Sequence, residues 1–238
     1  MLLEQLREQA NKVAETDVDM STASKGGERY LLPEGVALGR MVEYIEFGKH
    51  PEEYKGEVKS PAMQIRIGFA LYGEGYQKED GSPRVISTYQ MKLSNNEKSK
   101  SFKLFKNMNA KKCYKNFAQM LGEPFLIPIV HTTNGKGTWA RIDLDNIRYA
   151  VDPVTKKPYN VPMPEDKFYR VFLWNNPTKE QWDSIHIESN NFLQEMCLQA
   201  TNFKDSPLDK MLNGSMPELA VKPNVPEEAA DTYENIPW

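Results

Sequence analysis

The sequence contains few of the residues that build enzyme active sites. Its 238 residues include three histidines and two cysteines, and none of these is spaced with Asp or Glu as the ligands of a metal ion usually are. The run Asn134-Gly135-Lys136-Gly137-Thr138 has a Gly-Lys pair but lacks the upstream glycine of a phosphate-binding loop, so we expect a hairpin turn there. These absences predict a protein that is not an enzyme and that holds neither a metal ion nor a cofactor.

Long hydrophobic runs are missing as well. No apolar stretch approaches the roughly 20 residues that a membrane helix needs, and the N-terminus turns polar at once, unlike a secretory signal. Cys113 and Cys197 lie far apart in the chain, which favours two buried thiols over a disulfide. We therefore expect a soluble protein of a reducing cytoplasm, the host cytoplasm if a phage encodes the chain.

The net charge of −3 hides two segments of opposite charge. Residues 84–116 hold nine Lys or Arg and one acid, a surplus of eight positive charges. The last 24 residues, 215–238, hold five acids and one Lys, a surplus of four negative charges. A basic segment attracts a polyanion such as DNA, and an acidic tail on the same chain can compete with that polyanion for the basic surface.

The acidic tail ends on an aromatic residue followed by the chain's carboxylate. A basic pocket can hold such a carboxylate while an apolar pocket takes the ring, so the end can serve as a peptide ligand. The tip resembles that of bacterial single-stranded DNA-binding proteins, which ends on Ile-Pro-Phe and is bound by replication proteins. The alternative is that Trp238 folds back onto the domain. The residues predicted to bind a partner protein are Asp231, Glu234, Ile236, Pro237 and Trp238.

Four regions follow one another along the chain. Residues 1–29 combine a short amphipathic helical arm, with apolar side chains three and four apart from Leu2 to Val13, and a polar linker. Residues 30–152 show the patterns of strands. Residues 153–214 begin proline-rich and become helical, and we expect them to pack on the central domain. Residues 215–238 are rich in Pro and Glu and poor in large apolar residues, which predicts a disordered tail.

The central region predicts strands in the order of an OB-fold. Residues 63–72 alternate most clearly, with Ile65, Ile67 and Phe69 on the core face. The other elements are expected as strands at 36–47 and 84–93, helices within 98–121 and a hairpin of 125–130 with 138–144, with a polar loop at 50–61. Three strands, a helix and two strands are the order of that five-stranded barrel. We predict a mainly β fold with added helices: an OB-fold barrel with an N-terminal helical arm, a C-terminal helical extension and an acidic disordered tail.

Aromatic and basic residues are interleaved over the first three predicted strands and the helix that follows. A protein that binds single-stranded DNA without sequence preference needs cations for the phosphates and rings on which bases stack. Phe47 and Tyr89 alternate with the core face, which leaves a structural and a binding role open for both. Arg66, Tyr72 and Lys92 lie on the opposite face and are the strongest candidates. The full predicted DNA-binding set is Tyr44, Tyr54, Arg66, Tyr72, Tyr76, Arg84, Lys92, Lys98, Lys100, Phe102 and Lys103.

Several short segments between residues 30 and 150 resemble tailed-phage single-stranded DNA-binding proteins of the OB-fold type. The segments are Leu32-Pro33-Glu34-Gly35, 40–48, Ile86-Ser87, 94–99 and 121–125, followed by the Gly-Lys-Gly turn. The resemblance implies a protein that coats single-stranded DNA during phage DNA replication, recombination or repair. The partners of the tail would be replication or recombination proteins such as a polymerase, a primase-helicase or a nuclease. The resemblance assigns no individual DNA contact.

Two other functions stay open. An OB-like domain could bind protein and act as an adaptor in a replication complex. A metal-dependent nuclease could use Asp143 and Asp145 to hold Mg²⁺, although aspartates at strand ends are common. Whichever function applies, the apolar face from Leu2 to Val13 could support a homo-oligomer.

Overall fold

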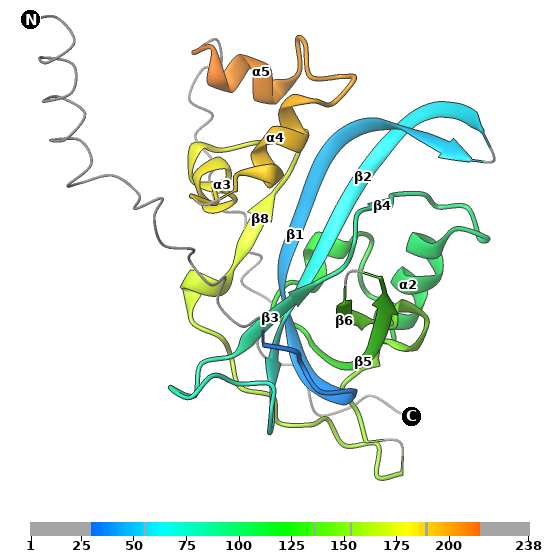
Figure 1. The fold of residues 1–238 in the computed structure, drawn as a ribbon, viewed down its shortest axis with the longest axis vertical. Helices are drawn as coiled ribbons and strands as arrows, with labels where there is room; N and C mark the ends of the chain where they lie inside the picture. The colour runs from blue at the N-terminus through cyan, green and yellow to red at the C-terminus, as the bar shows by residue number, and fades with distance from the viewer. Residues whose placement is uncertain (1–29, 55, 136, 153, 189, 215–238) are drawn as a thin grey trace, which may run out of the picture. The chain divides into compact units, whose positions relative to one another are not determined.

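Two long antiparallel strands form the centre of the fold. The computed structural model describes residues 30–54, 56–135, 137–152, 154–188 and 190–214. Strand β1 (Gly35–Tyr54) pairs with β2 (Glu57–Tyr72) from Leu38 opposite Tyr72 to Tyr54 opposite Glu57. Irregularities in the register lie at three places along the pair. Such bulges bend a strand and increase its twist, and Figure 1 shows the pair as a curved ribbon.

Six shorter strands complete the sheet. They are β3 (Arg84–Ser87), β4 (Met91–Lys92), β5 (Pro124–Asn134), β6 (Gly137–Ile142), β7 (Arg148–Tyr149) and β8 (Arg170–Phe172). The order is β3-β2-β1-β5-β6, with β4 on β2, β7 on β5 and β8 parallel to β1. Within the described residues, no hydrogen-bonded pairing joins the edge strands β3 and β6. The mainly β fold with added helices is confirmed, whereas the sheet is open and the closed barrel is not confirmed.

The polar segment 50–61, predicted to be a loop, is instead the outer part of the β1–β2 hairpin. His50 lies opposite Ala62, and Glu52 lies opposite Lys59. Residues 56–61 are exposed, so this part has no core-facing side to produce an apolar alternation. The segment is a strand only because its backbone pairs across the hairpin, and such pairing leaves no pattern in the sequence.

The predicted third strand, 84–93, is divided into β3 and β4. Between them, the backbone N–H of Thr88 donates to the Ile67 carbonyl at 2.7 Å, and the Thr88 hydroxyl accepts from the Ile67 N–H at 3.1 Å. Thr88 and Met91 are both buried, so the alternation of faces shifts between them. Tyr89 consequently points outward and is 42% exposed.

The helical segment 98–121 contains α2 (Lys100–Met108) and the 3-10 helix η1 (Phe117–Met120). The predicted break near residues 107–109 is confirmed, because Asn109 ends α2. The Asn109 side chain donates to the Tyr114 carbonyl at 2.8 Å and accepts from the Tyr114 N–H at 3.3 Å. These two bonds order the turn after the helix.

The inner face of the sheet and α2 enclose the main core. Ile65, Ile67 and Phe69, from the predicted core face of β2, are fully buried. Leu104 and Met108 of α2 pack against the same cluster. Burying side chains of this size stabilises the fold by about 1.5–3 kcal/mol each, and a slip of one residue would turn the whole core-facing side of β2 away from this core.

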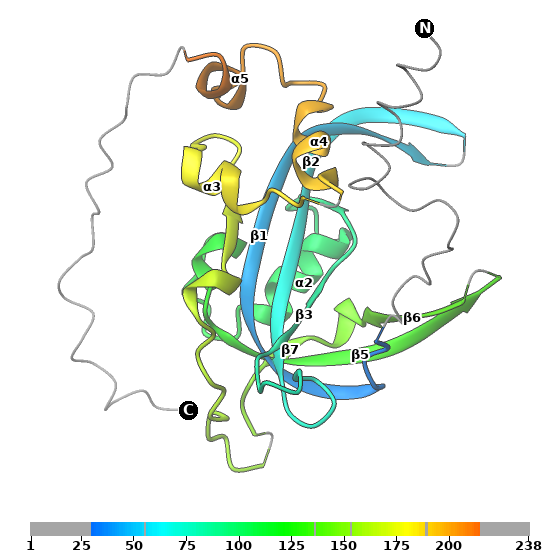
Figure 2. The ribbon, with the colours of Figure 1, turned by 60° about the vertical axis from the view of Figure 1, so that its left-hand side comes forward.

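Residues 166–213 cover the outer face of β1 with a second core. They form η3 (Asp166–Phe168), β8, α3 (Lys179–Ser184), α4 (Phe192–Leu198) and α5 (Pro207–Leu212). Phe172, Trp174 and Trp182 are buried in one cluster with Ile45 and Phe47 of β1. Figure 2 shows these helices beside the far end of β1 and β2. We call residues 166–213 the C-terminal module.

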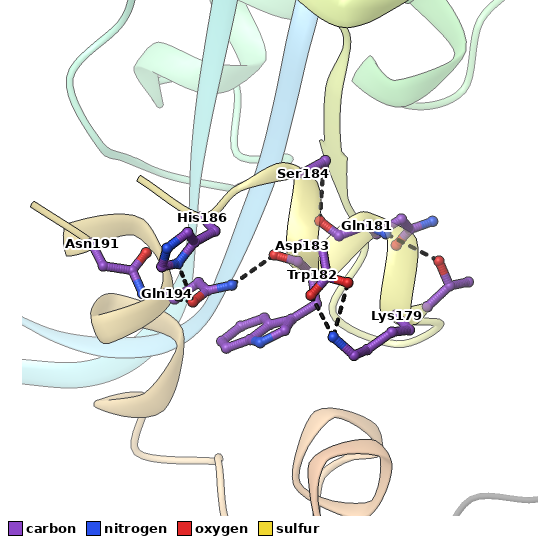
Figure 3. A network of polar contacts seen from close by, with 9 residues as sticks. Lys179, Gln181, Trp182, Asp183, Ser184, His186, Asn191 and Gln194 are labelled. Atoms are coloured by element: carbon purple, nitrogen blue, oxygen red, sulfur yellow. Dashed lines mark hydrogen bonds and ion pairs between the residues drawn. The ribbon is translucent and has the colours of Figure 1, made fainter. Parts of the chain in front are cut away.

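A network of polar contacts joins α3 to α4 within this module (Figure 3). The buried Gln194 side chain donates from Nε2 to the Trp182 carbonyl at 2.7 Å, and its Oε1 accepts from Asn191 Nδ2 at 2.6 Å. His186 Nδ1 lies 3.3 Å from the same oxygen. Because that oxygen can only accept, Nδ1 of His186 is the protonated nitrogen. The network fixes the connection between the two helices.

The structure also bears on the predictions for the two cysteines and for membrane helices. Both cysteines are free, but Cys113 is exposed, contrary to the prediction of two buried thiols, and Cys197 is buried. Cys113 lies beyond the end of α2, where the turn that Asn109 orders leaves it outside the core. In the described part of the chain, no helix is long and apolar enough to cross a membrane.

Gly48 lets β1 approach the C-terminal module closely. A Cβ at Gly48 would lie 2.6 Å from Ala200 Cβ and 2.7 Å from the Trp174 ring, and its φ is +82°. We expect Gly48→Ala to lower the free energy of unfolding by about 2–4 kcal/mol, from overpacking and backbone strain together. Gly56→Ala is the matched control, because Gly56 has φ +80° and nothing within 4 Å of such a Cβ. It should cost about 1 kcal/mol in urea denaturation, and equal costs for the two variants would contradict the close packing.

Candidate nucleic-acid interface

Helix α2 presents lysines on the side that faces away from the core. Ser99 begins the helix, and its hydroxyl accepts from the Phe102 N–H at 3.1 Å. Leu104 and Met108 are buried, whereas Lys100, Lys103 and Lys106 are exposed. Their spacing of three residues places these lysines along one side of the helix, and its first turn contains no acid.

Tyr89 lies close to two cations, one on this helix and one on strand β6. Lys100 Nζ is 3.2 Å from the Tyr89 hydroxyl and 5.6 Å from the ring centroid. Arg141 of β6 places its Cζ 5.5 Å from the same centroid. A half-exposed ring with two cations close to it combines a surface for base stacking with charges for phosphate.

The lysines around Tyr89 differ in how far their charge is already neutralised. Among the described residues, Lys98, Lys103 and Lys106 have no carboxylate oxygen within 4 Å. Lys92, by contrast, lies 3.7 Å from Glu52, and both side chains are partly exposed. Of these four lysines, the three on α2 or just before it therefore carry the unpaired charge.

Lys111 belongs to a separate network at the far end of the basic segment. Its Nζ lies 3.0 Å from Glu123 Oε2 and 4.7 Å from the Tyr149 ring centroid. Burial alone would raise the pKa of Glu123, but hydrogen bonds from Tyr114 and Lys111 outweigh it and hold that pKa below its usual value. Lys111 therefore contributes to local structure more than to a free cationic surface.

Three of the predicted DNA-binding tyrosines are buried. Tyr44 packs in the main core and its hydroxyl donates to Glu46 at 2.9 Å, and Tyr76 donates to the Pro33 carbonyl at 3.2 Å. Tyr72 lies in a third cluster with Val161, and burial raises its pKa. All three rings are buried, so the structure offers no surface at Tyr44, Tyr72 or Tyr76 on which a base could stack.

Arg66 is largely occupied by an ion pair with a buried carboxylate. Its Nε lies 2.8 Å from Glu43 Oε1, and the Glu43 side chain is 2% exposed. Phe192 of α4 covers the guanidinium, with its ring centroid 5.3 Å from Cζ. The non-core face of β2 was predicted to bind DNA from alternation alone, and alternation does not show that the C-terminal module packs over it.

The remaining predicted residues are placed as follows. Lys92, Lys98, Lys100 and Lys103 are exposed, and Phe102 is half-buried with Lys106 Nζ 5.9 Å from its ring. Arg84 is half-buried and donates to the Gln77 carbonyl at 3.2 Å.

Tyr54 ends β1, and its side chain lies outside the described part of the structure. The residues predicted to bind a partner, Asp231, Glu234, Ile236, Pro237 and Trp238, and the arm at 1–29 also lie outside the described residues.

Tyr89, Arg141 and Trp139 join the site although the predicted DNA-binding set omits them. Tyr89 was placed on the core face, and the break after β3 reverses its direction. Arg141 and Trp139 lie two residues apart on β6 and so share one face of the hairpin. In the sequence, Trp139 and Arg141 alternate with the core residues Ala140 and Ile142, and this alternation could have shown that they face away from the core.

Asp143 has a structural role at the end of β6. Its Oδ1 accepts from the Asp145 N–H at 3.2 Å and its Oδ2 from Asn146 Nδ2 at 2.7 Å, which caps the turn η2 (Leu144–Asn146). Among the described residues, no group of three or more His, Cys, Asp or Glu side chains could hold a metal ion. The geometry gives the nuclease alternative no specific support.

No family model, no curated protein and no solved structure matches this chain.

The buried ion pair gives a prediction for Arg66. Arg66→Met leaves Glu43 buried without its cation, so we expect a loss of about 3 kcal/mol in the free energy of unfolding. The double variant Arg66→Met/Glu43→Gln should recover most of it. Urea denaturation measures the stability, and a titration with oligo-dT measures binding. Weaker binding by an Arg66→Met protein of unchanged stability would contradict the structural role.

Proposed function

We propose that this protein binds single-stranded DNA and coats it during DNA replication, recombination or repair, in a phage if a phage encodes it. The observation that supports this most is the exposed ring of Tyr89 with Lys100 and Arg141 both within 6 Å of its centroid, at one end of a lysine-lined helix. The arrangement of five of the strands, β3-β2-β1-β5-β6 with α2 between the third and fourth along the path of the chain, is compatible with an opened OB-type barrel.

The chemistry of the surface suits a flexible polyanion. Lys98, Lys103 and Lys106 can approach successive phosphates, because their charges are not held by carboxylates in the described structure. Each neutralised phosphate of a single strand makes the logarithm of the binding constant fall by about 0.7 per tenfold rise in salt. A base stacked on Tyr89 adds a contribution that salt does not screen, on the order of 1–3 kcal/mol.

The proposal assigns the acidic tail to partner proteins. Five acids and Trp238 within residues 215–238 provide a ligand for a basic and apolar pocket on a polymerase, a primase-helicase or a nuclease. The tail's negative charge also complements the lysines of α2, so DNA and tail would compete for the same surface. No catalytic step is part of this function.

The role of the α2 lysines can be separated from a general effect of charge. Lys103→Gln/Lys106→Gln should weaken oligo-dT binding at low salt and reduce the slope of log K against log salt by roughly 1.4, since two phosphate contacts are lost. Lys179→Gln is the control, because Lys179 is an exposed helical lysine paired with Asp183 on α3. Equal slopes for both proteins would place the DNA elsewhere.

Tyr89 provides the second test of the same surface. Tyr89→Ala should reduce the affinity for oligo-dT by about tenfold or more, whereas Tyr89→Phe keeps the ring and should bind within about threefold of the unmodified protein. Fluorescence titration measures both affinities. If the two variants bind equally well, stacking on this ring is not part of binding.

The tail gives a prediction of opposite sign. Deleting residues 227–238 removes four acids and Trp238, so DNA affinity at low salt should rise by a few-fold while binding to the partner enzyme is lost. A variant with Trp238→Ala alone should lose the partner and keep the DNA affinity of the full chain. Unchanged affinity and intact partner binding after the deletion would remove the tail from the proposed function.

A further inference from the structure

One part of the outer sheet face carries exposed apolar side chains. Val36 at the start of β1 is 60% exposed, and Val130 of β5 is 40% exposed. Val130 lies directly opposite Arg141 of β6, and Thr132 lies opposite Trp139. Because paired residues share a face, these side chains form one surface, which we call the β5–β6 strip. Figure 2 shows β5 and β6 extending away from the rest of the sheet.

The remainder of this outer face is covered by the protein itself. Leu38 and Tyr72, which lie opposite each other on β1 and β2, pack in one cluster with Val161, Phe168 and Tyr169. Arg40 on the same face donates to the carbonyls of Gly122 and Val161 at 2.5 and 2.6 Å. The cover ends before Val36 and Val130, so the β5–β6 strip is the uncovered end of an otherwise packed face.

The strip adjoins the cations of the proposed binding surface. Arg141 belongs to the strip by its position on β6, and its guanidinium reaches the Tyr89 ring. Lys100 lies on that ring as well. An apolar floor bordered on one side by cations matches a ligand with flat apolar faces on a negatively charged backbone. Unpaired nucleotides have this chemistry, whereas a duplex hides its base faces within the stack.

We propose that the β5–β6 strip seats unpaired bases next to the base stacked on Tyr89, so that the protein recognises bases as well as phosphates. This inference rests on the proposed function and extends it to a second set of residues. Trp139 supplies the stacking ring of the strip, and Val130 and Val36 supply its apolar floor. The strip lies on β1, β5 and β6. Elsewhere the outer face of the central hairpin is covered by later segments of the chain and cannot bind a base.

The test compares oligo-dT with an abasic oligonucleotide of the same length at one salt concentration. The unmodified protein should bind oligo-dT at least tenfold more tightly. Trp139→Ala and Val130→Asn should each reduce this preference by about fivefold or more and leave the affinity for the abasic strand within about twofold. Val58→Asn is the control, because Val58 is 75% exposed on the β1–β2 hairpin. Trp139→Phe should retain the preference, and thermal melting monitors the folding of every variant.

The outcomes separate the two proposals. Equal affinity of the unmodified protein for both strands overturns the base-seating strip while single-strand binding stands. Unchanged preference in Trp139→Ala and Val130→Asn also overturns it. Binding of neither strand overturns the proposed function together with the strip. Tryptophan fluorescence gives an independent readout: Trp174 and Trp182 are buried, so quenching by oligo-dT that persists in Trp139→Phe with Trp238 also replaced by Phe would contradict the strip.

Discussion

The burial of β1 on both faces determines where this protein can meet a ligand. Between Met41 and Phe47 the strand contributes to three hydrophobic clusters. Met41 and Tyr44 lie in the main core shared with α2, Val42 lies in the third cluster, and Ile45 and Phe47 lie in the core shared with the C-terminal module. A strand with two packed faces cannot present side chains to DNA. The accessible surface is therefore displaced to the ends of the sheet and to α2, where Tyr89, Arg141 and the lysines lie.

The ion pair of Glu43 and Arg66 shows that packing on both faces of the sheet can give a structural role to an arginine expected to bind DNA. An arginine on a polar strand face has the chemistry of a phosphate contact, but here its charge is matched by a carboxylate that is itself removed from water. Phe192 then closes the pair from the side of the module. Such a pair adds little net stability, but loss of either partner is costly, because the other charge would be left buried without compensation.

The sequence was sufficient for the features that local patterns control. Alternation along 63–72 identified the buried residues of β2, and the Asn-Gly and Lys-Gly pairs identified the β5–β6 turn. The lysines of 98–103 are exposed as expected. The surroundings of Tyr44, Tyr72 and Arg66 could not be predicted from local patterns. Tyr44 packs in the main core, and later segments of the chain cover Tyr72 and Arg66. The sequence left the role of Tyr89 open, because the break between β3 and β4 that turns its ring outward is not signalled by either neighbouring residue.

The central claim is that single-stranded DNA lies along α2, Tyr89 and the β5–β6 hairpin and not over the face of β2. Photocrosslinking with an oligonucleotide that carries 5-iodouracil, followed by mass spectrometry of the linked peptides, locates the bases directly. We expect the linked residues to be Tyr89 and Trp139, with the peptide of α2 also represented. Crosslinks confined to the C-terminal module or to the neighbourhood of Tyr72, in a protein that binds the oligonucleotide, would contradict the claim.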